Sequence, residues 1–436
     1  MLKMTEYAKR RRALMQQMGP GGIAILPAAN DRVRNGDALY PFKQNSDFYY
    51  LTGFNEPEAI VVLAQKRKEG EYILFNRVRD PDREIWDGPR AGQKGACKDF
   101  QADQAFAMDQ FTSMLPELLS GRESIHYPLG ANHKMDKMVT QAVNQLRAKI
   151  RAGAQSPISF LDVAPSLHEM RLIKSNQEIV MMQKAVDITR EAHLSAMKAC
   201  KPGKYEYELE AELTFAFQKN GARYPAYNPI VASGKNACIL HYVTHDKKIE
   251  HGDLILIDAG AEYQQYAADI TRTFPANGRF SAEQRAIYEL VLEAQMAAIQ
   301  SIRAGSLWIK AQQVIVKVIT QGLIDLKILK GRLHDLIEQE AYSKFYMHRS
   351  GHWLGLDVHD AGRYKMGESW RPLQAGMVLT VEPGIYLSSN IPGIPKQFQN
   401  IGVRIEDDVL VTEKGCKVLS EKIPKKIADI EQVMAK

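Results

Sequence analysis

From Leu172 onward, the sequence passes twice through the same order of predicted elements. The segment SNQE at residues 175–178 is a capping box that opens a long helix ending near Cys200, and a second helix and several strands follow it. The segment SAEQ at residues 281–284 opens the same order again, with a break at Ala304-Gly305 between its two helices. The two halves share element order rather than residue identity. This order predicts a pseudo-twofold domain with strands at the centre and helices outside.

The first 170 residues or so have a different pattern. Short apolar runs such as GIAILPA, AIVVLA and EYILF alternate with helical stretches near residues 5–18 and 103–120. A chain of 436 residues is also longer than one hydrophobic core normally supports. We therefore predict an α/β domain over residues 1–172 and a second domain over residues 173–436.

The charge balance excludes one class of partner. The chain has 57 basic and 51 acidic residues, a net charge of +6, and its one dense basic run, Lys9 to Arg12, falls in the first predicted helix. Nucleic-acid binding needs a wider basic stripe, so we interpret this run as a solvated helix face and expect no nucleic-acid partner.

The cysteines and the apolar runs point to a compartment. The four cysteines have no short spacing, which argues against a zinc knuckle or a disulfide framework and favours a reducing environment. The N-terminal segment MLKMTEYAKRRRALM lacks the apolar core of a signal peptide, and no run approaches the roughly 18 apolar residues of a membrane span. We expect a cytoplasmic protein with no membrane partner.

Two aspartates occur where strand-like segments end or begin. Asp258 closes the apolar run LILID, and Asp269 lies eleven residues later in YAADITRTF, where it shares a strand face with Thr271 and Thr273. A hairpin centred near residues 263 and 264 would place the two aspartates directly opposite each other. Two like charges in that position are destabilising unless a cation lies between them. The alternative is a pair of unrelated aspartates at exposed strand ends.

Histidines gather in the segment FYMHRSGHWLGLDVHD. It holds His348, His352 and His359 within twelve residues, although the whole chain has only 11 histidines. A lone histidine is more often a buried, hydrogen-bonded core residue than a ligand. Three histidines beside several glycines favour a site.

Two further carboxylates complete the candidate set. Glu382 follows the apolar run MVLTV and precedes Pro383-Gly384, which favours an extended residue and then a turn. In IGVRIEDD, Arg404 and Glu406 share one strand face, and the structural alternative is an exposed hairpin with Asp407-Asp408 in its turn. The ordered combination of all these pieces is more informative than each piece alone.

The charge of the set indicates its cofactor. Asp258, Asp269, Glu382 and Glu406 carry four negative charges, which match two divalent cations, and His352 adds one imidazole. Oxygen donors with one nitrogen favour a hard or borderline ion, so we expect two metal ions, with manganese(II) first. Cobalt, iron or zinc would fit the same ligands.

The motifs resemble a known family of enzymes. The segments LIDAGAEYQQYAADITRTF, HWLGLDVHD, VEPGIY and GVRIEDD are similar to those of the pita-bread metallopeptidases, which include methionine aminopeptidase, prolidase and aminopeptidase P. Together with GARYPAYNPIVASGKNACILHY and NSDFYYLTGFNEPEA, they are most similar to the bacterial aminopeptidase P branch, and the resemblance covers nearly the whole chain. It implies an α+β fold, in which a creatinase-like α/β domain precedes a pita-bread catalytic domain with a central curved antiparallel sheet and outer helices.

The resemblance also implies roles for individual residues. Asp258 would bind one metal, His352 and Glu382 the other, and Asp269 and Glu406 would bridge the two. His241 and His359 would contact the substrate or the developing oxyanion, whereas His348 and Arg404 would lie at the prolyl pocket. The family commonly assembles through its N-terminal domain, which implies a homodimer or homotetramer with Trp86 or Asp37 near a neighbour's site.

The implied activity is release of the N-terminal residue from peptides with proline at the second position. The hypothesis is that a hydroxide bridging two metals attacks the carbonyl before proline and Glu382 carries the proton to the leaving nitrogen. Two alternatives stay open. A prolidase would cleave X-Pro dipeptides, and a metal-free peptide-binding module would keep the fold without the chemistry.

Overall fold

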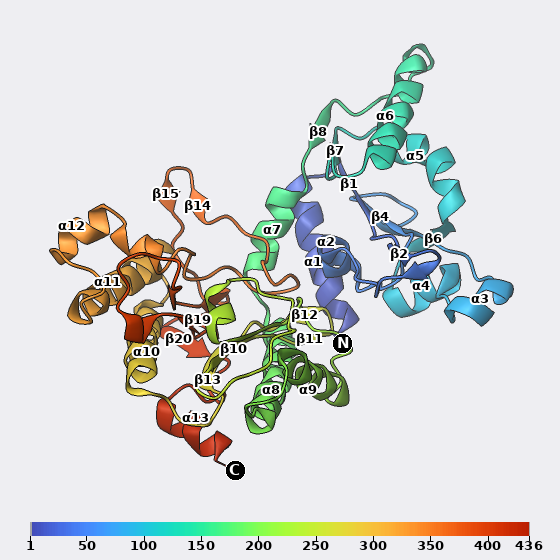
Figure 1. Ribbon diagram of the computed structural model, residues 1–436. Coiled ribbons are helices and arrows are strands. Elements are labelled where there is room, and N and C mark those ends of the chain that lie inside the picture. Colours follow the sequence, from blue (N-terminus) through green and yellow to red (C-terminus); the bar gives the residue numbers. More distant parts are fainter. Residues whose placement is uncertain (1, 436) are drawn as a thin grey trace. The chain divides into compact units, whose positions relative to one another are not determined.

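The computed structural model describes residues 2–435, and the chain divides into two compact units between Arg171 and Leu172 (Figure 1). Each unit is described by itself. None of the helices in the described part of the chain is long and apolar enough to cross a membrane.

The N-terminal unit contains a six-stranded mixed sheet in the order β6-β5-β4-β1-β7-β8. β1 pairs antiparallel with β4 and parallel with β7, and the central strands are buried along almost their whole length because they are continuous apolar runs. Its helices and strands are α1 (Met4–Met18), β1 (Gly22–Pro27), β2 (Val33–Asn35), β3 (Ala38–Leu39), α2 (Ser46–Thr52), β4 (Ile60–Ala64), β5 (Tyr72–Asn76), α3 (Pro81–Asp87), α4 (Gly92–Phe100), β6 (Gln104–Ala107), α5 (Phe111–Leu119), β7 (Ser124–His126), α6 (His133–Ala148), β8 (Ser159–Leu161) and α7 (Ala164–Leu172).

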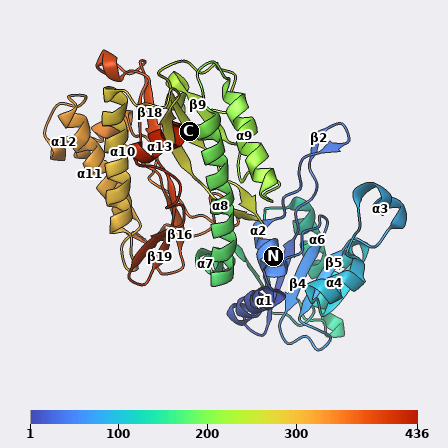
Figure 2. The ribbon, with the colours of Figure 1, turned by 90° about the horizontal axis from the view of Figure 1, so that it is seen from below.

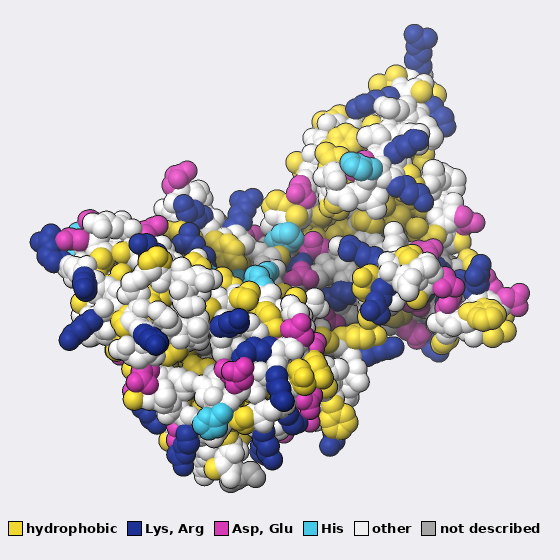
Figure 3. Space-filling model, viewed as in Figure 1, with side chains coloured by type: hydrophobic (Ala, Val, Ile, Leu, Met, Phe, Trp, Pro, Cys, Tyr) yellow, Lys and Arg dark blue, Asp and Glu magenta, His cyan; other side chains and the backbone are white. Residues whose placement is uncertain are grey.

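Two predictions for this unit are wrong in detail. The stretch near 103–120 is not one helix, because β6 precedes α5. Lys9 to Arg12 is not simply a solvated helix face, since Arg10 and Arg11 are only 3% and 5% exposed. They donate to the carbonyls of Tyr50 and Leu51 at 3.1 and 2.9 Å, at the C-terminal end of α2, where helix carbonyls lack partners within the helix. Over the face seen in Figure 3, Lys and Arg side chains (dark blue) are scattered among acidic ones.

The C-terminal unit has small sheets at its centre and long helices around them. α8 packs against α9 and α10 against α11, and the strands lie between these two pairs (Figure 2). The elements are α8 (Asn176–Ala199), α9 (Glu206–Lys219), β9 (Ile230–Ser233), β10 (Leu254–Asp258), β11 (Glu262–Tyr263), β12 (Tyr266–Ala267), β13 (Thr271–Pro275), α10 (Ala282–Ser301), α11 (Ile309–Asp325), α12 (Leu333–Glu338), β14 (Lys365–Met366), β15 (Ser369–Trp370), β16 (Val378–Val381), β17 (Gly384–Leu387), β18 (Ile401–Arg404), β19 (Asp407–Thr412), β20 (Gly415–Val418) and α13 (Ile427–Met434).

The predicted repeat of element order is present in this unit. Both predicted capping boxes form, with Ser175 capping α8 and Ser281 capping α10. Each helix pair is followed by antiparallel strands, in the orders β13-β10-β9 in the first half and β16-β19-β20 with β17-β18 in the second. One large apolar core joins the helices of both halves to these strands. The strands therefore meet at the centre, where their ends can bring polar side chains together.

The register of the first hairpin differs from the prediction. Gln264 and Gln265, both with positive φ, form its turn, so Tyr263 pairs with Tyr266 and Asp258 pairs with Thr271. Asp258 is thus not directly opposite Asp269, because the turn centre lies one residue further along the chain than predicted. Asp258 pairs with a residue two positions beyond Asp269. Because side chains alternate between the two faces of a sheet, this shift by two residues leaves Asp258 and Asp269 on the same face.

Candidate metal centre

Four of the five predicted metal ligands, the carboxylates, lie at or near the end of a strand, and the fifth, His352, lies in a loop. Asp258 ends β10 and Glu382 follows β16, while Asp269 lies between β12 and β13 and Glu406 between β18 and β19. His352 comes from the loop before Trp353, which bridges to Leu379 of β16. Apolar residues bury these strands and the carboxylates begin where the apolar runs stop. The centre is therefore assembled from both halves of the unit.

The carboxylates are removed from solvent. Asp258, Asp269 and Glu406 are 9%, 5% and 1% exposed, which excludes the alternative of aspartates at exposed strand ends. Asp407 and Asp408 are fully buried too, so the exposed hairpin considered for IGVRIEDD is wrong. Its two strands, β18 and β19, belong to different sheets.

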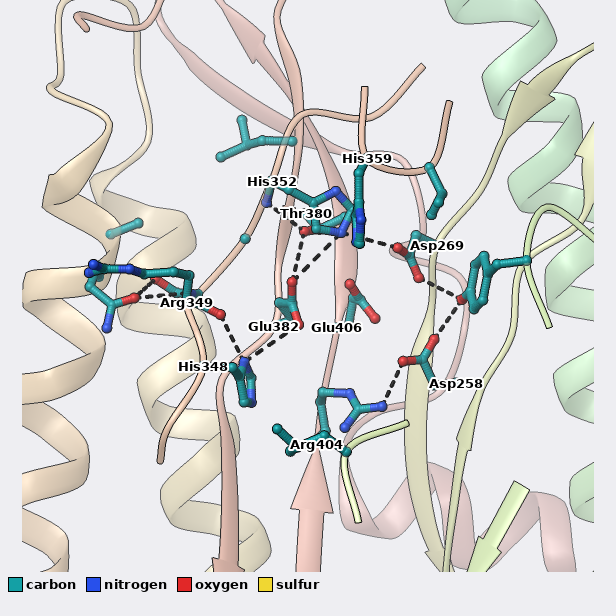
Figure 4. A pocket seen from close by; sticks show the side chains of 18 of the residues that line it. Asp258, Asp269, His348, Arg349, His352, His359, Thr380, Glu382, Arg404 and Glu406 are labelled. Atoms are coloured by element: carbon teal, nitrogen blue, oxygen red, sulfur yellow. Dashed lines mark hydrogen bonds and ion pairs between the residues drawn. The ribbon is translucent and has the colours of Figure 1, made fainter. Parts of the chain in front are cut away.

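The ligand atoms converge. Asp269, His352 and Glu406 offer ligand atoms that all lie within 4.8 Å of one another. Nε2 of His352 lies 3.2 Å from Asp269 Oδ2 and 3.7 Å from Glu382 Oε1. In Figure 4, Asp258 and Asp269 lie on one side of Glu406, and His352 and Glu382 lie on the other.

The pKa shifts of these groups reflect their burial and their closeness to one another. Burial, and then the charges of neighbouring carboxylates, raise the pKa of Glu406 well above its usual value. Burial raises the pKa of Glu382 to about 7, with Asp269 adding to it and His352 opposing it. Burial alone would lower the pKa of His352, but the hydrogen bond and charge of Asp269 outweigh it and raise that pKa to about 9. Groups that share a site in this way stabilise bound cations.

Arg404 supplies positive charge at one edge of the centre. Its Nη2 donates to Asp258 Oδ2 at 2.6 Å and its Nη1 donates to the Tyr386 hydroxyl at 2.9 Å. Burial by itself would raise the pKa of Asp258, but Arg404 and the hydroxyl of Tyr227 outweigh it, so that pKa is lowered. Among the four carboxylates, Asp258 is therefore the one whose charged form is stabilised by Arg404 and Tyr227.

His348 forms part of a hydrogen-bonded relay with Arg404. The Tyr386 hydroxyl, which accepts from Arg404, lies 2.8 Å from His348 Nε2, while His348 Nδ1 lies 2.8 Å from the carbonyl of Arg349. Burial and then the Arg404 charge lower the pKa of His348 to about 4. The imidazole is thus neutral, donates through Nδ1 and accepts from Tyr386 through Nε2.

All nine predicted site residues line one cavity of about 850 Å³. Close contacts join Asp269 and Glu382 to His352, Glu382 to His348, and Asp258 to Arg404. The His359 ring packs edge-to-face on His352 with a centroid distance of 4.4 Å, whereas His241 is exposed at the cavity wall. Further lining comes from aromatic and aliphatic side chains, among them Trp308, Tyr364 and Trp370.

Sequence reasoning missed two tyrosines. The Tyr227 hydroxyl lies 2.5 Å from Asp258 Oδ1 and 2.5 Å from Asp269 Oδ1, between the two aspartates. Tyr386 links Arg404 to His348. Gly384, expected to form a turn, lies instead in β17, and a Cβ on it would lie 2.5 Å from the Tyr386 hydroxyl. Tyr227 comes from an irregular loop, so no periodic signal marks it, while Tyr386 shares a face with Gly384 by the period of two.

A fit to divalent cations follows from the donors alone. Asp269, His352 and Glu406 converge within 4.8 Å, and Asp258 and Glu382 line the same cavity. Oxygen donors with a single nitrogen suit hard or borderline ions. The Nδ1–H of His352 donates to the Trp353 carbonyl at 2.9 Å, which leaves Nε2 directed at the carboxylates. A histidine fixed in this way is typical of metal ligands.

Comparisons with known proteins agree with this geometry. The model of metallopeptidase family M24 matches residues 180–413, and that of the aminopeptidase P N-terminal domain matches residues 7–126. The Xaa-Pro aminopeptidase of Escherichia coli K12 is 45% identical over 98% of this chain and 97% of its own length.

Solved structures give the same result. The structure of Pseudomonas aeruginosa aminopeptidase PepP superposes with a TM-score of 0.98 at 53% identity, over 100% of this chain and 98% of that one. Zinc-substituted E. coli aminopeptidase P in complex with product superposes with a TM-score of 0.96 at 44% identity, over 100% and 98% of the two chains. The resemblance and the fold class predicted from the sequence are confirmed, and the chain belongs to metallopeptidase family M24, in its aminopeptidase P branch.

Proposed function

We propose that this chain is an Xaa-Pro aminopeptidase, a metal-dependent exopeptidase that releases the N-terminal residue from peptides with proline at the second position. The observation that carries the proposal is the convergence of Asp258, Asp269, His352, Glu382 and Glu406 at one end of a cavity large enough for a short peptide. The names of the relatives, which match over almost their full length, support the substrate class.

The five ligands would hold two divalent cations. Asp258 would bind one ion, His352 and Glu382 the other, and Asp269 and Glu406 would bridge the two. Glu406 lies between Asp258 and Glu382 in Figure 4. Manganese(II) is the proposed ion because most donors are carboxylate oxygens, and the zinc-substituted E. coli relative indicates that such a centre accepts more than one metal. When bound, the pair would lower the pKa of a water molecule and polarise the carbonyl of the scissile bond.

The protein's own groups would orient the substrate and move the proton. Glu382, whose carboxylate faces His352 and His348, would pass a proton to the leaving nitrogen of proline. His241 and His359 would contact the peptide carbonyl, and His348 and Arg404, joined through Tyr386, would form the wall of the prolyl pocket. An X-Pro amide has no N–H to donate and a fixed ring, so recognition by shape rather than by that hydrogen bond is required.

We further propose functions for the two units. Residues 1–172 would provide oligomerisation and substrate access, with the exposed Trp86 and Asp37 near a neighbouring copy in a homodimer or homotetramer, and residues 173–436 would carry the catalysis. The four free cysteines fit the cytoplasmic location expected for the chain.

One assay separates this proposal from its alternatives. The pure protein is treated with chelator, supplied with manganese, and compared on an X-Pro-Y tripeptide, an X-Pro dipeptide and Met-Ala-Ser. We expect metal-dependent release of X from the tripeptide. Cleavage of the dipeptide alone would identify a prolidase, and no cleavage of any of the three would identify a binding module.

A further inference from the structure

A buried ion pair outside the ligand set supports the loop of residues 353–360, which is called the histidine loop below because it follows His352 and contains His359. Lys174 Nζ lies 2.9 Å from Asp360 Oδ2, and both side chains are only 1% exposed. Lys174 immediately precedes Ser175, the N-cap of α8, whereas Asp360 immediately follows His359. Burying two charges has a large desolvation cost, which only close pairing and further hydrogen bonds offset. This pair thus ties the start of α8 to one specific conformation of the loop.

The loop from Trp353 to Asp360 folds around the pair. A Cβ on Gly355 would lie 2.3 Å from Asp360 Oδ2 and 3.0 Å from Lys174 Cε, so the backbone approaches the pair as closely as a glycine allows. The N–H of Asp357 lies 3.4 Å from Asp360 Oδ1, and the N–H of Asp360 donates to the Trp353 carbonyl at 2.9 Å. The carboxylate of Asp360 therefore holds its own loop closed.

The Trp353 carbonyl connects this loop to the metal centre. It accepts the N–H of Asp360 and also the Nδ1–H of His352, each at 2.9 Å. The second bond sets which ring nitrogen of His352 points to the carboxylates. Because one carbonyl accepts both groups, moving Asp360 would move the acceptor that orients the His352 ring.

Two more contacts connect this loop to the metal centre. His359 precedes Asp360 in the chain, and its ring packs on His352 with a centroid distance of 4.4 Å and an interplanar angle of 77°. The Gly355 carbonyl accepts the N–H of Ala267 at 2.8 Å, two residues before Asp269. The loop that the ion pair holds is thus in contact with two site histidines and with the hairpin that carries a bridging carboxylate.

We infer that Lys174 and Asp360 are positioning residues for the metal centre, which act by holding the loop that orients His352 and His359. The inference rests on the proposed function and deepens it, since it assigns the geometry of the second metal's histidine ligand to a lysine that lies outside the cavity lining. Neither residue touches the substrate or the metals in this scheme.

Four variants test the inference. Lys174→Met keeps a side chain of similar length and removes its charge. Asp360→Asn removes the partner charge, and the double variant removes both charges. Lys247→Met is the matched control, because Lys247 pairs with Asp253 at 2.6 Å in the same unit but outside the histidine loop. Cobalt(II) is titrated into each metal-free protein and followed by its visible absorption spectrum, at a temperature where circular dichroism shows a folded chain. kcat and KM are then measured on an X-Pro-Y tripeptide.

For Lys174→Met we expect the second cobalt ion to bind roughly 10- to 100-fold more weakly, with an altered spectrum, as for other losses of outer-shell support. kcat should fall by a similar factor with little change in KM. The double variant should be no worse than the more affected single variant, because the two residues act as one pair. Lys247→Met should bind both ions as the wild type does.

Two results would overturn the inference. One is a folded Lys174→Met protein with wild-type cobalt affinity and spectrum. The other is an equal loss in Lys247→Met, which would mean that reduced stability alone weakens the site. If Lys174→Met does not fold, the double variant, which leaves no unpaired charge, decides by the same readouts. Failure of the wild type itself to bind two ions would overturn the proposed function, and this inference with it.

Discussion

The Arg404 guanidinium donates to the Asp258 carboxylate at 2.6 Å, and both side chains are almost completely buried. The same guanidinium donates to Tyr386, so it spans the metal centre and the proposed prolyl pocket. A planar guanidinium makes these two contacts through two separate nitrogens in a fixed geometry, whereas a lysine ammonium carries all its donors on one nitrogen and cannot reproduce that geometry.

Arg404→Lys should therefore lower kcat/KM for an X-Pro-Y tripeptide by about 10- to 100-fold while the charge beside Asp258 is kept. Steady-state kinetics on the manganese-loaded protein measure the change. A variant with wild-type kcat/KM would show that the link between Asp258 and Tyr386 has no catalytic importance.

Asp269→Asn should abolish activity with little loss of fold. Asp269 is a proposed bridging ligand, and the amide removes a negative charge that a bridging ligand has to supply. Metal content of the purified protein should fall below two ions per chain, measured by elemental analysis. Full activity of this variant after removal and re-addition of metal would falsify the two-metal assignment.

Tyr227→Phe should destabilise the metal-free protein more than the metal-loaded one. The hydroxyl lies between the Asp258 and Asp269 carboxylates, and bound cations would take over the screening of their repulsion. The difference in Tm between the two forms should therefore be larger in the variant than in the wild type. The control is Tyr288→Phe, which loses a partly buried hydrogen bond of 2.7 Å to the Lys425 carbonyl and should shift both forms equally.

Gly260→Ala should strongly destabilise the C-terminal unit. A Cβ at Gly260 would lie 1.7 Å from the Ala268 carbonyl oxygen, across the hairpin that carries both aspartates. The strands would have to separate, which costs several kcal/mol, on the order of 3 or more. At Gly415, by contrast, a Cβ meets nothing within 4 Å, so Gly415→Ala should leave Tm and metal binding unchanged.

His193 should make the fold sensitive to acid. Burial lowers the pKa of this histidine in α8 to about 4, with the hydrogen bond to the Ala259 carbonyl opposing the shift. The unfolded chain titrates near the usual value of about 6.5, so between these two values the unfolded state binds the extra proton. The contribution of His193 to the free energy of unfolding is fully present above about pH 6.5. It should be lost as the pH drops toward 4, and the loss for this group is on the order of 3 kcal/mol.

Thermal unfolding in chelator, followed between pH 7 and 4.5, checks this dependence. His193→Asn keeps an N–H donor without titrating and should show a shallower loss of Tm with acid than the wild type. His334, which is exposed, serves for comparison, and His334→Asn should retain the wild-type slope.

Local signals in the sequence predicted the elements well where they depend on neighbouring residues. The capping boxes at Ser175 and Ser281 formed because both partners lie within one helical turn. The predicted register of the hairpin was wrong because the position of the turn depends on which residues adopt positive φ. Gln264 and Gln265 adopt it here, although glutamine is not typical of that conformation. Arg10 and Arg11 were misjudged because their partners, the carbonyls ending α2, lie 40 residues away.

The sequence by itself determined which residues are proposed as ligands, since carboxylates and a histidine near the ends of apolar runs follow from residue type and order. Only the tertiary structure decided how these residues are oriented. Tyr227 between the two aspartates, Tyr386 between Arg404 and His348, and Lys174 beneath the histidine loop join segments far apart in the chain. Such contacts arise from the packing of whole elements, which no local pattern encodes, and they set the distances on which metal binding and catalysis depend.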